Sequence, residues 1–308
     1  MRVPCACRPI VALAIIAVAA RSVCGLELWA DDAPVLPSGA RAFSTYRTVT
    51  VRNAMPVDVG AHRYERIRRT SSDEIVRTVY NPEGQFLWDT VFSYEDDRLV
   101  RIRAFDPDER WRLGFEYDED GRPVRESYHT GEGAPERTIV YEYGAQTVEV
   151  ISYRGDGSVA WRRTESKGDA GDERETTFYY ADGTRIKTIV AVLDEDGRPV
   201  VERHLDELGA TYRTVEREYG EDGPVEEHVR ADGAVVRTTT WEYDTEGRLV
   251  ERRVKLPNEG REERLVVSYS VNERGHWTER TETSYARYDG EEEFVTDRVL
   301  LERHVEYE

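Results

Sequence analysis

The sequence predicts an all-β protein, built as a long antiparallel meander of about 18–20 strands in a single curled or twisted sheet, or in a partial spiral of β-hairpin repeats. Three observations carry this prediction. Apolar or aromatic residues are repeatedly followed four positions later by glycine, with acidic residues between. The segments between these glycines are rich in β-branched and aromatic residues. Beyond the N-terminal segment, apolar residues do not recur at helical spacing over three turns.

The repeated glycines indicate tight reversals between strands. An aspartate at the first turn position can bond the backbone two residues on, and glycine then supplies a left-handed conformation without steric cost. A type I turn closed in this way is a common hairpin connection. The predicted structural turn glycines are Gly84, Gly121, Gly157, Gly197, Gly209, Gly223, Gly233 and Gly247.

A second recurring feature places two large side chains two residues apart at the end of a strand. Such pairs share one face of the strand. Examples are Phe92 with Tyr94, Phe115 with Tyr117, Tyr141 with Tyr143, and Trp241 with Tyr243. Their spacing indicates an internal repeat of two strands, about 25 residues long.

Composition favours a thin architecture and excludes some partners. The chain is 39% hydrophobic and 34% charged, so it has few apolar residues for one thick core. Tyrosine and tryptophan can compensate because each covers a large area while its polar tip stays hydrated. The formal net charge of −19 argues against binding nucleic acid or an anionic membrane surface.

The N-terminus resembles an export signal. A basic start precedes an apolar run over 10–20 that is too short to span a bilayer, which is typical of a signal peptide. We therefore expect a signal peptide over 1–25, a flexible Pro- and Gly-marked tether over 26–44, and the β-repeat domain over 45–308. No transmembrane segment is expected after cleavage.

All three cysteines, Cys5, Cys7 and Cys24, lie in this leader, so no disulfide is expected in the mature domain. Cys24 is a candidate lipidation site because the residues before it faintly resemble a bacterial lipoprotein box. Arg21 and Val23 depart from that pattern, and a plain soluble exported protein is the alternative. The expected location is outside the cytoplasm: periplasmic, anchored to the outer membrane through lipid, or extracellular.

The form Tyr-Asp-x-x-Gly-Arg occurs intact at Tyr117–Arg122 and Tyr243–Arg248, each followed by a strand. It resembles the YD repeat of rearrangement-hotspot and teneurin-type proteins, in a short exported bacterial member. In large members this resemblance implies a β-ribbon that spirals into a hollow shell around a toxin. Here no toxin domain is expected after the repeats, and about twenty strands are expected to be too few for a closed shell, so the resemblance implies a twisted meander.

Residues that could carry chemistry are scattered. The six histidines lack metal-ligand spacing, and His204 and His228, each just before a turn, are expected at surface strand positions. The pairs Asp118/Asp120 and Asp194/Asp196 could hold Ca²⁺, but turn formation explains them better. No nucleophile elbow, mature cysteine or phosphate-binding loop is recognised. We expect no enzymatic activity, no metal and no cofactor.

Two binding functions remain. The first is a non-catalytic cell-envelope scaffold or protein-interaction module, in which the open edges of a wide acidic sheet pair with an envelope protein. The alternative is a carbohydrate-binding module that stacks glycans on exposed Tyr and Trp stripes, Trp241 among them. The same aromatic residues are also needed for cross-strand packing.

Overall fold

The computed structural model describes residues 40–52, 55–81, 83–96, 98–105, 110–130, 133–168 and 172–307. The predicted signal peptide and the candidate lipidation site Cys24 lie outside these described residues, as does most of the predicted tether. The first described strand begins at Ala40, inside the range predicted as tether.

The described chain forms twenty strands and one short 3₁₀ turn. The first ten strands are β1 (Ala40–Arg52), β2 (Met55–Ser71), β3 (Glu74–Tyr80), β4 (Phe86–Glu95), β5 (Arg98–Phe105), β6 (Arg110–Tyr117), β7 (Pro123–Thr130), β8 (Arg137–Tyr143), β9 (Thr147–Arg154) and β10 (Val159–Lys167). They are followed by β11 (Glu173–Tyr180), β12 (Arg185–Leu193), β13 (Pro199–Leu205), β14 (Thr211–Tyr219), β15 (Pro224–Ala231), β16 (Ala234–Tyr243), β17 (Leu249–Leu256), η2 (Pro257–Glu259), β18 (Arg261–Val271), β19 (Trp277–Tyr288) and β20 (Phe294–Tyr307).

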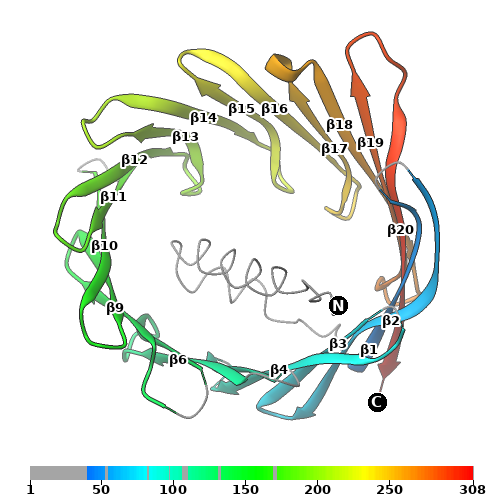
Figure 1. Cartoon of the computed structure of the whole chain (residues 1–308), viewed down its shortest axis with the longest axis horizontal. Helices are drawn as coiled ribbons and strands as arrows, with labels where there is room; N and C mark the ends of the chain where they lie inside the picture. The colour runs from blue at the N-terminus through cyan, green and yellow to red at the C-terminus, as the bar shows by residue number, and fades with distance from the viewer. Residues whose placement is uncertain are drawn as a thin grey trace, which may run out of the picture.

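The strands close into a barrel. Each strand pairs antiparallel with the next, and β20 pairs with β1 through contacts from Ala40↔Tyr307 to Val51↔Arg298, so that the single sheet forms the ring seen end-on in Figure 1. The predicted all-β antiparallel meander is confirmed. The expectation of an open, curled sheet is wrong, and so is the expectation that twenty strands are too few to close: they close directly as a cylinder instead of spiralling.

Register shifts near the turns favour this closure. Shifts occur between Glu116 and Tyr117, between Glu218 and Tyr219, and between Glu242 and Tyr243, each where a strand enters its hairpin. A bulge bends its strand and increases the local twist. Because many hairpins carry one, the bend accumulates around the sheet, and curvature of this kind is what a barrel requires.

The hairpin turns use aspartate and glycine together. In the turn after β6, Gly121 N–H donates to the Asp118 carbonyl (3.0 Å), while an Asp118 carboxylate oxygen accepts from Arg122 N–H (2.9 Å). Gly121 has φ +79°. The eight glycines named from the sequence all have positive φ, from 75° to 146°. Glycines 183, 260, 275 and 290 adopt the same region.

Gly157→Ala tests how much stability the barrel loses when a residue with a Cβ must adopt a left-handed backbone conformation. Gly157 has φ +82°, and a Cβ placed there would meet nothing within 4 Å. Forcing alanine into this left-handed conformation is expected to cost about 1 kcal/mol. Gly133→Ala is the matched control, because its added Cβ also meets open space but no positive φ is present. Chemical denaturation measures both; equal effects in the two variants would contradict the expectation.

The Tyr-Asp-x-x-Gly-Arg motif also links one repeat to the next. Tyr143 hydroxyl donates to the Pro123 carbonyl at 2.8 Å, and Tyr243 hydroxyl donates to the Pro224 carbonyl at 3.2 Å. Where arginine follows the turn glycine, at Arg122, Arg198 and Arg248, it pairs with its own turn aspartate and covers the tyrosine ring of the following repeat. Arg122 does so with Asp118 (2.7 Å) and the Tyr143 ring (4.7 Å). Arg198 over Tyr219 and Arg248 over Tyr269 repeat this contact. Each motif therefore stabilises its own turn and the neighbouring strand pair.

Candidate functional site: the inner wall of the barrel

Cross-strand pairing sorts the strand residues into two faces of the wall. Directly paired residues lie on the same face of a sheet. One face can be followed through the pairs Phe92↔Ile102↔Leu113 and, on later strands, through Val215↔Val229↔Arg237. The opposite face carries the alternate residues, such as Arg101, Arg112 and Glu216.

The face that includes Ile102 and Val215 is the inner wall. On a concave surface neighbouring side chains converge and cover each other, and most of the buried residues belong to this face, with Ile102 at 0% and Val215 at 1% exposure. Arg101 and Arg112 on the other face are exposed. Barrels of sixteen or more strands are wider than their inward side chains can fill, so a twenty-stranded wall encloses a lumen.

Aromatic side chains on the inner wall mainly pack against each other and against aliphatic neighbours. One cluster joins Phe92, Leu99, Ile102, Leu113 and Phe115, with four partly buried aromatic rings against it. A second joins Ile139, Tyr141 and Val150, with Trp161 packed beside it. Trp241 lies on the same face, opposite Arg252, and is partly buried. The aromatic side chains of these clusters therefore serve the wall itself. Exposed aromatic residues of this face lie elsewhere, at Trp88, Tyr180, Tyr288 and Phe294.

The inner wall also carries a charged network across β13–β16. Arg217 contacts Glu202 at 3.0 Å and Glu227 at 2.9 Å, and Arg237 donates to Glu227 at 2.6 Å. Burial would raise the pKa of the Glu227 carboxyl, but the hydrogen bonds and charges of Arg237 and Arg217 outweigh it and hold the pKa below its usual value. Glu227 is therefore an ionised, buried centre between two guanidinium groups.

A second buried carboxyl has a different environment. Glu126 is 5% exposed and accepts a hydrogen bond from the Tyr141 hydroxyl. Burial raises the pKa of Glu126, against the opposing effects of Tyr141, Arg137 and Arg163. The pKa of Tyr141 is raised as well, first by burial and then by Glu126. Tyr141 thus stays a neutral donor to this carboxyl.

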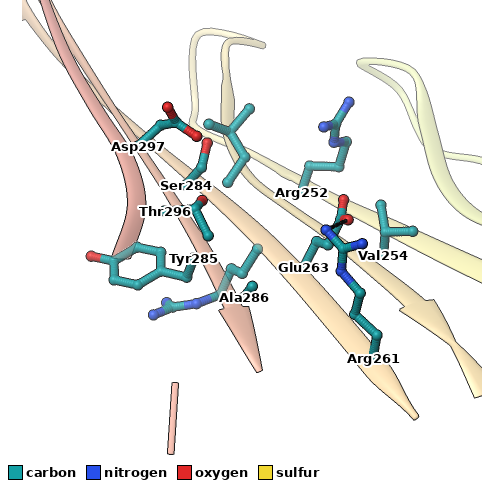
Figure 2. Close-up of a pocket in the computed structure, with 11 residues that line it drawn as sticks. Arg252, Val254, Arg261, Glu263, Ser284, Tyr285, Ala286, Thr296 and Asp297 are labelled. Atoms are coloured by element: carbon teal, nitrogen blue, oxygen red, sulfur yellow. Dashed lines mark ion pairs between the residues drawn. The ribbon is translucent and has the colours of Figure 1, made fainter. Parts of the chain in front are cut away.

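A cavity of about 340 Å³ opens on the same wall between β17 and β20 (Figure 2). Arg252, Glu263 and Asp297 line it from three strands, together with small and aliphatic side chains. Arg261 pairs with Glu263 at 2.6 Å, so part of this charge is already compensated. The cavity combines both signs of charge with a few apolar side chains, such as Val254 and Leu265.

The outer wall is polar at the middle of its strands. Arg101, Arg112, Arg203 and Arg253 are exposed there on β5, β6, β13 and β17. Ion pairs run between neighbouring strands, such as Arg162–Glu149 at 3.3 Å and Arg230–Glu216 at 3.2 Å. Because the inner wall holds Arg217 and Glu227 at comparable positions, neither face of the described barrel carries an apolar band uninterrupted by charge.

The turn glycines and the aspartates considered for Ca²⁺ lie in the hairpin turns and not on the inner wall. The turn glycines lie in the hairpin turns at the ends of the barrel. Asp118 and Asp194 bond their own turns and pair with Arg122 and Arg198. In the described part of the chain no group of three or more His, Cys, Asp or Glu could hold a metal ion. None of its helices has the length and apolar character to cross a bilayer.

His204 is placed differently from the expectation. The sequence suggested a surface strand position, but His204 pairs across the inner face with Ile189 and Arg213 and is partly buried. Nothing in its local sequence distinguishes it from His228, which lies on the outer face and contacts Thr238 (3.1 Å) and Glu226 (3.4 Å). Register alone separates the two histidines.

No protein-family model and no curated protein matches the chain. Among solved structures, a porin-like protein from Bacteroides uniformis is 10% identical with a TM-score of 0.39, covering 88% of this chain and 98% of the other. A BenF-like porin from Pseudomonas fluorescens is 8% identical with a TM-score of 0.24, covering 87% and 99%. A TcdB2-TccC3-Cdc42 structure is 12% identical with a TM-score of 0.26, covering 76% and 17%. Scores this low carry no functional inference.

The closed wall overturns both functions expected from the sequence. The scaffold hypothesis required free sheet edges for a partner strand, but β1 and β20 pair with each other and leave no free edge in the described sheet. The carbohydrate-binding alternative required exposed aromatic stripes, whereas the aromatic pairs are largely packed within the inner wall.

Proposed function

We propose that this protein is a barrel of the cell envelope, exposed to water on its outer wall, that encloses a guest molecule in its lumen. The supporting observation is the exposed arginine at mid-strand on the outer wall, combined with a more apolar inner wall. At the midplane of a bilayer each lipid-facing arginine of a barrel costs about 2–4 kcal/mol. Such residues on β5, β6, β13 and β17 favour water as the surrounding medium.

The predicted signal peptide over 1–25 supports export as the route to the envelope. The proposed role needs no catalytic group and no cofactor. Its binding surface is the inner wall, which offers aromatic rings, the Glu227 network and the cavity beside Arg252. Guests that combine apolar and charged groups match this surface.

Phase separation in a mild detergent tests the medium around the barrel. The Cys24→Ser variant of the full chain should be used, since lipid on Cys24 would itself draw the protein into detergent. We expect this variant in the aqueous phase, because the charged outer wall loses hydration in a micelle. Recovery in the detergent phase would contradict the proposal.

Single cysteines test whether the lumen is enclosed. With Cys5, Cys7 and Cys24 replaced by serine, a cysteine is introduced at Val254 on the inner wall or at the adjacent Lys255 on the outer wall. Small maleimides should label both positions, whereas bulky polymer maleimides should label Val254→Cys much more slowly than Lys255→Cys. Equal labelling by the large reagents would show that no enclosed lumen exists.

The second candidate function is an outer-membrane channel. The specific observation in its favour is the even number of strands in a closed antiparallel meander, the architecture of bacterial outer-membrane barrels. In that case the Cys24→Ser variant would enter detergent micelles and give discrete conductance steps in planar bilayers. The exposed mid-strand arginines lead us to expect neither result.

A further inference from the structure

Two cationic side chains and a histidine gather on the inner wall of β12–β14. His204 and Arg213 are directly opposed across β13 and β14. Ile189 on β12 is the opposite neighbour of His204, and Lys187 lies two residues from Ile189 on the same face. Lys187 is therefore the diagonal neighbour of His204, a separation that long side chains can bridge. These three residues are called the basic cluster below.

The basic cluster differs from the ion-pair network beside it. Arg217, on the same face of β14, is held between Glu202 and Glu227. No ion pair joins Lys187 or Arg213 to an acidic residue within the described ranges; Lys187 lies over the Phe178 ring at 4.8 Å. The positive charge of the basic cluster is therefore not neutralised by the wall.

Two nitrogen atoms of the basic cluster are buried without a hydrogen-bond partner in the described structure. These are His204 Nε2 and Arg213 Nε. A buried polar group without a partner destabilises the folded protein, so such groups are normally satisfied by protein, water or ligand. Unpartnered arginine Nε atoms recur along the described barrel, but His204 Nε2 is the one histidine nitrogen among these buried atoms, and its residue is directly opposed to Arg213. His204 Nε2 therefore marks a position for an external partner.

The electrostatics of His204 agree with this geometry. The pKa of His204 is lowered, first by burial and then by the positive charge of Arg213. Lys187 and Arg217 add to this effect, while Glu202 opposes it. His204 thus lies in a positive local field although the whole chain has a net charge of −19.

We propose that Lys187, His204 and Arg213 form a binding site for an oxyanion, a carboxylate or phosphate group, carried by the guest in the lumen. This assignment rests on the proposed lumenal function for the identity of the guest, while the site itself is defined by its own side chains. An oxyanion accepts hydrogen bonds from both unsatisfied nitrogens and neutralises the excess charge. Bonds to an ionised acceptor are stronger than neutral ones, especially where water is partly excluded.

Selective ¹⁵N labelling of histidine in the full chain tests this site. The His204 resonance is followed against pH in the presence of inorganic phosphate, acetate or chloride. A bound oxyanion favours the protonated ring, so phosphate or acetate should raise the pKa of His204 relative to chloride. A larger effect of phosphate would indicate a phosphorylated guest, and a larger effect of acetate an acidic peptide.

Charge-neutral variants sharpen the test. Arg213→Gln and Lys187→Gln should each weaken anion binding about tenfold, the equivalent of about 1.4 kcal/mol. Arg203→Gln is the matched control, since Arg203 is adjacent to His204 in sequence but points to the outer wall, where it pairs with Glu173 at 3.5 Å. Lys187→Gln changes a second member of the cluster on another strand, so the test does not depend on correct folding of the Arg213 variant alone.

The outcomes separate this inference from the proposed function. A His204 pKa that neither anion moves, in a barrel whose lumen excludes bulky maleimides, would overturn the oxyanion site alone. Equal weakening of binding by Arg203→Gln and Arg213→Gln would also overturn it, because the effect would then reflect net charge. If the barrel partitioned into the detergent phase but the His204 pKa still rose with saturable anion binding, the oxyanion site would be supported. The proposed water-exposed outer wall would then be wrong.

Discussion

Replacing Ile102 by alanine should destabilise the barrel by about 2–5 kcal/mol, the range for deleting a large buried aliphatic side chain. Ile102 is fully buried in a wall only one sheet thick, where it packs with Phe92, Leu99 and Leu113. Its burial depends on aromatic rings that lie over it from neighbouring strands. The deletion leaves a cavity under those rings, which β-sheet pairing on both sides prevents from collapsing.

Urea unfolding followed by tryptophan fluorescence would measure this loss. Arg101→Ala is the control, because Arg101 is the preceding residue of β5 and is exposed on the outer wall. Its effect should stay within about 0.5 kcal/mol. If Arg101→Ala proved as damaging as Ile102→Ala, our assignment of the two faces would be wrong.

The second large loss of folding stability is expected from Glu227→Gln. The change keeps the shape of the side chain but leaves Arg217 and Arg237 without their shared counter-ion. Removing one member of a fully buried ion pair costs about 3–5 kcal/mol, and water access to Arg237 should reduce the loss here to about 2–3 kcal/mol. The adjacent Glu226→Gln is the matched control, since Glu226 lies on the outer wall and contacts His228 at 3.4 Å.

The difference in unfolding free energy between the wild type and Glu227→Gln should depend on pH in a defined direction. The folded-state pKa of Glu227 is lowered, so its contribution is fully present above the unfolded pKa of about 4.3. It is lost as pH falls through the lower folded pKa. The stability gap between the wild type and Glu227→Gln should therefore narrow in acid, and a gap that widens in acid would contradict the ion-pair assignment.

Closure of the sheet changes which surfaces can have a function. An open meander offers its edges, and the sequence therefore favoured pairing with another protein. Once β20 pairs with β1, backbone groups at the seam are satisfied within the chain, and the inner wall becomes the enclosed surface. The similarity to YD-repeat proteins stays a prediction, since no family model matches the chain.

The sequence by itself determined the local elements. Glycine at a left-handed position and aspartate at the start of a turn act within five residues, so Gly121, Gly197 and Gly247 could be assigned to turns without any tertiary information. The same holds for strands such as Ala234–Tyr243, whose β-branched and aromatic content is a local property. A meander of hairpins follows from these short-range preferences alone.

Only the tertiary structure decided closure, the inner and outer faces, and the basic cluster. The seam joins Ala40 to Tyr307, and bulges near the turns set how much each hairpin bends. A shift of one residue in register moves every side chain of a strand to the other face. His204 lies on the inner wall and His228 on the outer wall for this reason, because the face of a side chain depends on the register of the whole sheet and is not encoded in its neighbours.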